Sequence, residues 1–409
     1  MNSGFLIMLG AGSEHVHAIK YAQSMGCLVL VLDRNPSAPG AAMADVFLPH
    51  CVYRHEEAVA GLAQWRENGG VPGGVLCVAS DAPRTVAAIG EFFNLPAVSM
   101  ETAHLATDKL AMKDRLAAHG IPVPWYAPLR DSTDLRRAFQ ERCNHLVIKP
   151  VDNRGARGVL HLSFRSDLDW AFDLACAQSP TGRVMVEEFL EGQQVSTEGL
   201  MIDGTAHIPG FADRNYEFID RFAPHIIENG GDMPSLLPLA AQEAIRDLTG
   251  RAALALGLKH GPVKGDMLWH KEQAYVIEIA ARHSGGYFVT HSIPWNTGVD
   301  LLGASIRMAM GEVLDPAELR PRQQKAVCQR YLFAEPGLVR SIEGVEEARR
   351  LPYVRYVEVR VKKGDVILPV TSHPARPGVV MAVAETREAA GRAALAAIRT
   401  IIIRTEQAP

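Results

Sequence analysis

An acid and a base lie four residues apart in an apolar segment close to residue 280. Residues 275–286 read Tyr-Val-Ile-Glu-Ile-Ala-Ala-Arg-His-Ser-Gly-Gly, in which Glu278 and Arg282 carry formal charges. Side chains alternate between the two faces of an extended strand, so Glu278 and Arg282 are expected on the same face. Because an unpaired charge is costly to bury, each of the two should have a partner.

The segment before it, residues 261–269, predicts the other strand of a hairpin with a polar turn near residues 270–273. If the hairpin is symmetric about Glu272, Asp266 lies opposite Glu278. Two like charges facing each other across a strand pair are destabilising unless a cation lies between them. Mg²⁺ suits such a position, because it binds one or two carboxylates and completes its shell with phosphate oxygens. The register is inferred, so an exposed hairpin whose acids face solvent is an equal alternative.

A second segment has the residue types that bind phosphate. Residues 146–150, Leu-Val-Ile-Lys-Pro, predict a short apolar strand that ends in a lysine, and residues 152–159 follow as a loop with two glycines and two arginines. Glycines let backbone N–H groups approach an anion, and lysine supplies a point charge. The spacing matches neither the GxxxxGK[ST] phosphate loop nor the GxGxxG of dinucleotide folds. By itself the segment is also compatible with a surface turn.

Together with the segments around them, these stretches resemble the ATP-grasp superfamily, and within it the carboxylate–amine ligases that include L-amino-acid ligases. The resemblance extends through nearly the whole chain in the order of the family. The segments that carry it are residues 108–113, 120–124, 147–150, 155–159, 186–192, 261–266, 278–282, 285–286 and 297–300. Each piece is a weak signal, whereas the ordered set is specific.

The resemblance implies an ATP-dependent ligase that joins a carboxylate to an amine through an acyl phosphate and releases ADP and phosphate, with amino-acid-like substrates. The implied cofactors are ATP and Mg²⁺, with Mn²⁺ as the alternative to Mg²⁺. Phosphoryl transfer requires positioning and charge neutralisation, which these residue types provide. By this resemblance, Lys109 and Lys149 bind the α- and β-phosphates, and the loop with Gly155, Ala156 and Gly158 closes over the γ-phosphate. The main chain of Glu187, Glu188 and Leu190 recognises adenine, and Gln194 binds the ribose. Asp266 and Glu278 bind the metal, and Arg282 stabilises the transferring phosphoryl group.

Three positions depart from the pattern of the family. Gln194 stands where relatives commonly carry an acid for the ribose, and Ala156 stands where many carry a serine. Ala280 replaces an asparagine that contacts magnesium in many relatives. A small residue at that position is frequent in the L-amino-acid-ligase branch, so Ala280 favours that branch and leaves the coordination of a second magnesium open.

Two segments are candidates for substrate binding. Residues 213–235 are too rich in polar residues, glycine and proline for a core element, and they resemble the family's loop over the acceptor site. His225 and Glu228 are its candidate ligands, and a solvated connector is the alternative. On the acyl side the candidates are the four residues after Arg282, namely His283, Ser284, Gly285 and Gly286, where the backbone of the glycines could donate N–H groups to a carboxylate.

The alternation of elements indicates an α/β and α+β chain with the ATP-grasp fold. We expect an N-terminal parallel αβ (pre-ATP-grasp) domain over residues 1–105, an ATP-grasp lid over 106–190, a catalytic subdomain over 191–325 and a C-terminal β-rich cap over 326–409. The N-terminal strand 5–9 is followed by Gly10-Ala-Gly12, which without a third glycine is a weak dinucleotide signal. Ser80 and Asp81 end a further strand, where they could contact substrate or cap a helix.

Composition narrows the classes of function. The 409 residues are 47% hydrophobic and 22% charged, with a formal net charge of −4 and a sequence pI near 6.4, which argues against a nucleic-acid partner. No apolar run approaches the roughly 20 residues that span a bilayer. Six cysteines without a CxxC pair indicate reduced thiols and a cytoplasmic location. A homodimer is expected only because such pairs are common.

Two other functions stay open at this stage. The same fold could serve a carboxylase or a nucleotide-pathway ligase that uses bicarbonate, formate or a ribosylamine. A nucleotide-binding regulatory protein with a degenerate site is the alternative of another class. The joint presence of Lys149, Asp266, Glu278 and Arg282 argues against it, because a site without catalysis has no need of all four.

Overall fold

The computed structural model describes residues 4–142 and 145–406, so Cys143 lies outside the described residues. The chain forms two compact units. Unit 1 contains residues 1–123, 196–211 and 238–323, and unit 2 contains residues 124–195, 212–237 and 324–409. The boundaries of these two units differ from those of the four consecutive domains expected from the sequence, and the four expected boundaries remain a prediction.

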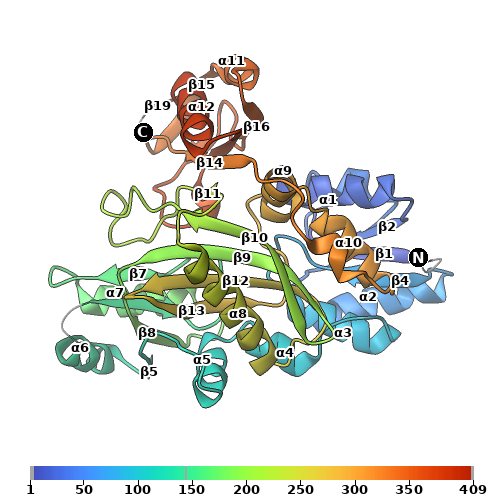
Figure 1. Ribbon diagram of the computed structural model, residues 1–409, viewed down its shortest axis with the longest axis horizontal. Helices are drawn as coiled ribbons and strands as arrows, with labels where there is room; N and C mark the ends of the chain where they lie inside the picture. The colour runs from blue at the N-terminus through green and yellow to red at the C-terminus, as the bar shows by residue number, and fades with distance from the viewer. Residues whose placement is uncertain (1–3, 143–144, 407–409) are drawn as a thin grey trace. The chain divides into compact units, whose positions relative to one another are not determined.

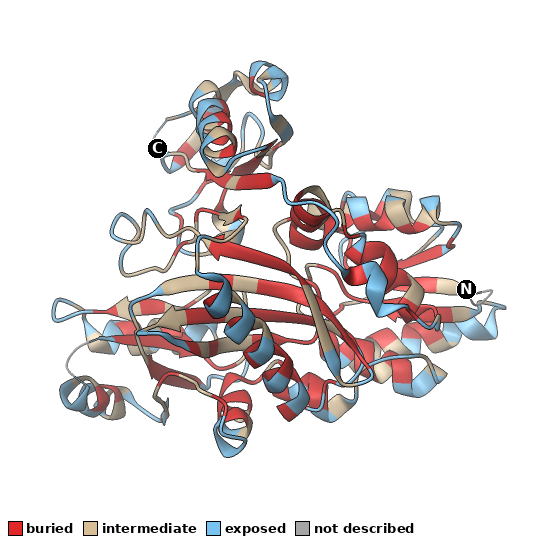
Figure 2. Cartoon of the chain, viewed as in Figure 1, coloured by how far each residue is buried: buried red, intermediate tan, exposed pale blue. Residues whose placement is uncertain are grey.

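Unit 1 begins with a parallel sheet of order β3-β2-β1-β4. Strands β1, β2 and β4 are buried along most of their length (Figure 2). This sheet confirms the expected N-terminal parallel αβ arrangement. Its elements are β1 (Phe5–Leu9), α1 (Ser13–Ser24), β2 (Val29–Leu32), β3 (Val46–Leu48), α2 (His55–Glu67), β4 (Pro72–Leu76), α3 (Pro83–Phe93), α4 (Met100–Leu105) and α5 (Lys109–Ala118).

The rest of unit 1 is built around an antiparallel hairpin, β12 (Gly261–His270) and β13 (Gln273–Ala280). Helix α8 (Leu239–Ala255) packs against both strands, and α10 (Leu301–Ala309) packs against β4 and β12 (Figure 1). A π-helical turn over Phe288–Ser292 and α9 (Ile293–Thr297) lie between the hairpin and α10 in the sequence. Strands β9 (Gln193–Ile202) and β10 (Thr205–Arg214) each pass from one unit into the other along the chain.

Unit 2 contains an antiparallel sheet of order β5-β8-β6-β7 with α6 and α7 in its connections. Its core joins the apolar sides of the strands to Leu135 and Ala175 of the helices. The elements are β5 (Tyr126–Leu129), α6 (Ser132–Glu141), β6 (Leu146–Pro150), β7 (Leu160–Leu162), α7 (Leu168–Gln178) and β8 (Val184–Glu188). The predicted lysine strand is therefore β6.

The C-terminal part of unit 2 is β-rich, as expected. Helix α12 packs against β14 and β18 (Figure 1). The buried residues of this helix are alanines. A second, antiparallel sheet has the order β17-β15-β19. The elements are β11 (Gly231–Met233), β14 (Ala326–Leu332), β15 (Gly337–Glu343), α11 (Val345–Arg350), β16 (Val354–Val359), β17 (Val366–Ile367), the 3₁₀ turn η4 (His373–Ala375), β18 (Gly378–Ala384), α12 (Arg387–Thr400) and β19 (Ile402–Glu406).

Among the described residues, no helix combines the length and the apolar character needed to cross a membrane. The cysteines within the described part of the chain are free thiols, and Cys27, Cys77 and Cys328 are buried.

Candidate functional site

The hairpin of unit 1 brings two acids into register. Asp266 pairs with Glu278 across β12 and β13, which confirms the predicted arrangement. Lys271 and Glu272 form the turn with φ of 45° and 61°, as a tight two-residue hairpin requires. The turn is therefore centred between these two residues and not on Glu272, and an irregularity between Asp266 and Met267 restores the opposition of the acids.

Each acid has a lysine beside it. Lys109 Nζ lies 3.6 Å from Glu278 Oε1, and Lys264 Nζ lies 2.5 Å from Asp266 Oδ2. Lys109 is the first residue of α5, whose N-terminus is capped by the side chain of Asp108. These ammonium groups offset the repulsion of the two carboxylates. The two acids do not face solvent fully, since the side chain of Glu278 is 24% exposed and that of Asp266 is 15% exposed.

The donor set on the hairpin fits magnesium. Within residues 4–142 and 145–406, no three or more His, Cys, Asp or Glu side chains gather as a metal cluster. Two carboxylates on adjacent rigid strands match the small number of protein ligands that Mg²⁺ takes when phosphate oxygens and water complete its shell. Ala280, which is buried, provides no third side-chain oxygen.

Arg282 lies just beyond the end of β13, which stops at Ala280. Its guanidinium Nε donates to Asp81 Oδ1 at 3.1 Å, and its Nη1 donates to the carbonyl of His283 at 3.1 Å. Burial opposes the charged guanidinium, but the carboxylate of Asp81 outweighs this effect and raises the pKa of Arg282. Asp81 does not cap the following helix, which begins without a side-chain cap. Its role as the partner of Arg282 was not predicted.

The residues after Arg282 differ in part from the prediction. His283 is fully buried and its ring binds protein groups on both sides, so it does not present a surface to a substrate. The N–H of Gly286 donates to Glu14 Oε2 at 2.8 Å. A Cβ on Gly285 would lie 2.5 Å from the same oxygen, so a larger residue there would have to displace the Glu14 carboxylate. A substrate carboxylate that used the Gly286 N–H would have to replace Glu14.

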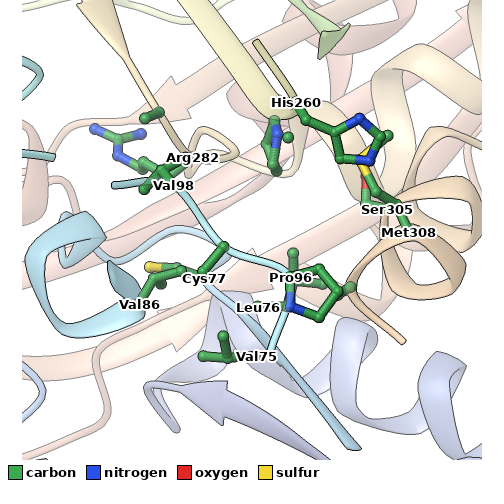
Figure 3. Close-up of a pocket in the computed structure, with 15 residues that line it drawn as sticks. Val75, Leu76, Cys77, Val86, Pro96, Val98, His260, Arg282, Ser305 and Met308 are labelled. Carbon is green, nitrogen blue, oxygen red and sulfur yellow. The ribbon is translucent and has the colours of Figure 1, made fainter. Parts of the chain in front are cut away.

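A small cavity of about 40 Å³ lies near Arg282 in unit 1. Its walls are largely apolar, with Val75, Val86, Val98 and Met308 among them, and the guanidinium of Arg282 points away from the other labelled side chains (Figure 3). The cavity's small volume and largely apolar walls leave little of the polar lining that would orient an amino-acid substrate.

In unit 2 the predicted phosphate lysine is buried beside an acid. Lys149 on β6 forms an ion pair with Glu187 on β8, and both side chains are about 5% exposed. Only a main-chain role was expected for Glu187, so its ion pair with Lys149 is an additional feature of the site. In this pair each charged group offsets part of the desolvation of the other.

The predicted phosphate loop has the backbone that its glycines allow. Gly155, Ala156 and Gly158 have φ of 66°, 58° and 71°. Alanine adopts this left-handed conformation only with strain. The carbonyl of Gly155 accepts from the N–H of His373 at 3.0 Å, so the C-terminal turn η4 contacts the loop within unit 2.

The segment predicted to read adenine joins β8 to β9. Glu188 is the last residue of β8, and its N–H donates to the carbonyl of Trp125 at 2.8 Å. Only its carbonyl therefore suits the predicted adenine contact. Leu190 lies in the connection between β8 and β9, and Gln194 is the second residue of β9. Both residues are partly buried.

The predicted acceptor segment is held by the C-terminal part of unit 2. Glu228 forms an ion pair with Arg214, and its carbonyl accepts from Arg376 Nη1 at 2.8 Å. His225 forms a β-bridge with Leu160, and burial lowers the pKa of its imidazole. The segment is thus fixed to the rest of unit 2 by these contacts and is not a solvated connector. A polar pocket of about 380 Å³ lies beside Arg214.

The sheet order, the lysine strand with its glycine loop and the paired acids of the hairpin define an ATP-grasp fold. Comparison with protein families agrees: residues 106–286 match the ATP-grasp domain, and residues 330–406 match the L-amino acid ligase C-terminal domain 2. Residues 106–286 are therefore an ATP-grasp domain, and residues 330–406 are similar to the C-terminal domain 2 of L-amino acid ligases.

Individual relatives are distant. An uncharacterized protein, y4rH, from Sinorhizobium fredii is 28% identical over 333 residues, 80% of this chain and 67% of that protein. A formate-dependent phosphoribosylglycinamide formyltransferase from Burkholderia thailandensis is 26% identical over 98% of this chain and 96% of its own. Among solved structures, an L-amino acid ligase from Bacillus licheniformis superposes with a TM-score of 0.83 and 21% identity over 100% of both chains, a likeness of fold.

Proposed function

We propose that this protein is an ATP-dependent carboxylate–amine ligase that forms an amide bond between amino-acid-like substrates and releases ADP and phosphate. The observation that carries the proposal is the hairpin of unit 1, where Asp266 faces Glu278. The partly buried Arg282 follows four residues after Glu278. The C-terminal match to the L-amino acid ligases supports an amino acid as substrate.

The chemistry follows from the poor reactivity of a carboxylate toward amines. An oxygen of the substrate carboxylate attacks the γ-phosphorus of ATP, the bond to the β,γ-bridging oxygen breaks, and ADP leaves. The amine nitrogen then attacks the carbonyl carbon of the acyl phosphate, the amide forms, phosphate leaves and the amine proton passes to solvent. No protein nucleophile is needed, so the work of the protein is positioning and charge neutralisation.

The residues of unit 1 are suited to the phosphoryl end of this reaction. Asp266 and Glu278 would hold Mg²⁺, which when bound neutralises phosphate oxygens. Lys109, 3.6 Å from Glu278, would contact a phosphate beside the metal. Arg282 would stabilise charge on the transferring phosphoryl group, since its orientation is already fixed by Asp81.

The residues of unit 2 are suited to the nucleotide. Lys149 would contact an α- or β-phosphate oxygen, exchanging part of its interaction with Glu187 for the phosphate. The loop with Gly155, Ala156 and Gly158 would donate backbone N–H groups to the γ-phosphate. Main-chain groups of Glu187, Glu188 and Leu190 would read adenine, and Gln194 would bond a ribose hydroxyl.

The test is a screen of acid and amine pairs with ATP and Mg²⁺, in which ADP and phosphate are measured. The proposal expects ADP release only when an amino acid or a similar acid and an amine are both present. The full-length similarity to a formyltransferase makes formate with a ribosylamine the second arm. ADP release in that arm alone would assign a nucleotide-pathway ligase, and its absence in every arm would favour a regulatory protein.

A further inference from the structure

A buried polar network lies behind Arg282 in unit 1. His283 and Glu198 are both 0% exposed. His283 Nδ1 lies 2.7 Å from Glu198 Oε1, and His283 Nε2 lies 2.6 Å from Ser305 Oγ. Glu198 belongs to β9 and Ser305 to α10, so the imidazole connects two elements that are far apart in the sequence.

The hydrogens of this network can be counted. The hydroxyl of Ser305 donates its only hydrogen to the carbonyl of Leu301 at 2.7 Å. Ser305 Oγ must then accept from His283 Nε2, which therefore carries a hydrogen. A second hydrogen lies between His283 Nδ1 and Glu198 Oε1, because two acceptors would otherwise face each other. The pair is neutral as a whole, which removes the cost of burying a single charge.

The same pair is connected to Arg282 and to the turn after it. The carbonyl of His283 accepts from Arg282 Nη1 at 3.1 Å and from the N–H of Ala79 at 3.3 Å. The other oxygen of Glu198 accepts from the N–H of Ser284 at 3.2 Å and from the hydroxyl of Ser284. A displacement of either member would move the backbone at residues 283–284, and with it the group that orients the guanidinium.

We propose that Glu198 and His283 are positioning residues, which act through this hydrogen-bonded pair to fix the guanidinium of Arg282 and the Ser284–Gly286 turn. The proposal rests on the ligase function inferred above, since that function gives Arg282 its role at the phosphoryl group. Neither side chain touches substrate, because both are wholly enclosed.

Two substitutions of Glu198 separate hydrogen bonding from volume. In Glu198→Gln the amide NH₂ donates to Nδ1 of a neutral ring while the amide oxygen accepts from Ser284, so every bond of the network is retained. In Glu198→Met the length of the side chain is kept and its polar atoms are lost. The buried Nδ1 of His283 and the N–H and hydroxyl of Ser284 then have no partner at this position. The two variants should therefore differ sharply.

The experiment measures kcat and the Kd for Mg-ATP in the screen-identified reaction. Glu198→Met should lower kcat by about tenfold or more with the Kd for Mg-ATP little changed, because Arg282 acts on the transition state. Glu198→Gln should stay within about threefold of the native kcat. A folded Glu198→Met protein with native kcat overturns the proposal, as does Glu198→Gln being as slow as Glu198→Met.

Controls address folding and the underlying function. Thr249→Val removes a buried 3.1 Å hydrogen bond to Thr197, outside the network, and should leave kcat unchanged. If Glu198→Met does not fold, Ser305→Ala removes the acceptor of His283 Nε2 with a smaller change and should still lower kcat. Native kcat in Ser305→Ala overturns the proposal.

If the native protein forms no ADP, crystal structures of the variants test the positioning role. The 3.1 Å contact of Arg282 Nε with Asp81 should persist in Glu198→Gln and be lost in Glu198→Met or Ser305→Ala. Its persistence in all variants refutes the positioning role, independently of the ligase function.

Discussion

At Arg282 the guanidinium is oriented by Asp81 and by the carbonyl of His283 before any substrate binds. A preorganised donor lowers the barrier because no reorganisation is needed when charge develops. The position requires the planar guanidinium group as well as a positive charge. Nε and Nη1 donate to two different acceptors, and the single ammonium group of lysine cannot reproduce this arrangement. Asp81 is 201 positions away in the sequence, so local pattern could indicate the arginine but not its partner.

We expect Arg282→Lys to reduce kcat by about 10²-fold or more, the scale for one lost preorganised donor, while ATP affinity barely changes. Equilibrium binding of Mg-ATP and turnover should be measured on the same protein. A large loss of ATP affinity with preserved turnover would show that Arg282 anchors the nucleotide, and its assigned role would be wrong.

Glu278→Ala and Asp266→Ala should each abolish turnover while changing the free energy of unfolding by only about 1 kcal/mol or less. Each substitution relieves repulsion between the facing acids and also removes an ion pair with Lys109 or Lys264, so the two effects oppose each other. Turnover at saturating Mg²⁺ and denaturant unfolding are the measurements. An unchanged rate would exclude the substituted residue as a metal ligand.

At the scale of elements, the positions of the site residues follow from how each element begins and ends. The Asp108 cap starts α5 at Lys109, and a tight turn with one strand irregularity sets Asp266 against Glu278. The N-terminal glycine turn has a structural reason as well: a Cβ on Gly10 would lie 2.2 Å from His15 Nε2. That glycine thus makes room for a buried histidine.

His15 should make the protein sensitive to acid. Burial lowers the pKa of His15, and the carboxylates of Glu14 and Asp33 offset this only in part. The unfolded chain then takes up a proton near pH 6.5 that the folded chain does not, so stability is present above this pH and falls below it, by at most about 1.4 kcal/mol per pH unit. Unfolding free energies between pH 5 and 7 should fall less steeply in His15→Gln. Equal slopes in both proteins would contradict this assignment.

The turn η4 should couple the phosphate loop to the acceptor segment inside unit 2. Arg376 is 8% exposed and its Nε donates to the carbonyl of His373 at 2.8 Å, while Nη1 donates to that of Glu228. Arg376→Met should lose about 1–3 kcal/mol of stability and increase hydrogen exchange around Gly155 and Glu228. The exposed Arg392→Met on α12 is the control. Exchange confined to the C-terminal strands would show that the turn does not hold the two loops.

At the scale of the whole molecule, the ordered set of motifs was sufficient to predict the ATP-grasp fold and the N-terminal parallel sheet, because these depend on local periodicity and on the order of segments. The predicted register of Asp266 and Glu278 was also correct. The burial of His283 was not foreseen, since it depends on Glu198 and Ser305, which lie 85 and 22 positions away. The same holds for the contact of the C-terminal turn with Gly155, for which no local signal exists.

In the proposed reaction, ATP activates the carboxylate of the acid substrate. The most direct measurement uses that acid with both carboxylate oxygens labelled with ¹⁸O, together with ATP, Mg²⁺ and the amine, followed by mass analysis of the phosphate. We predict that one ¹⁸O per turnover appears in inorganic phosphate, because the oxygen that attacks the γ-phosphorus leaves with it. Phosphate without the label, or label found in AMP, would contradict an acyl phosphate and the function built on it.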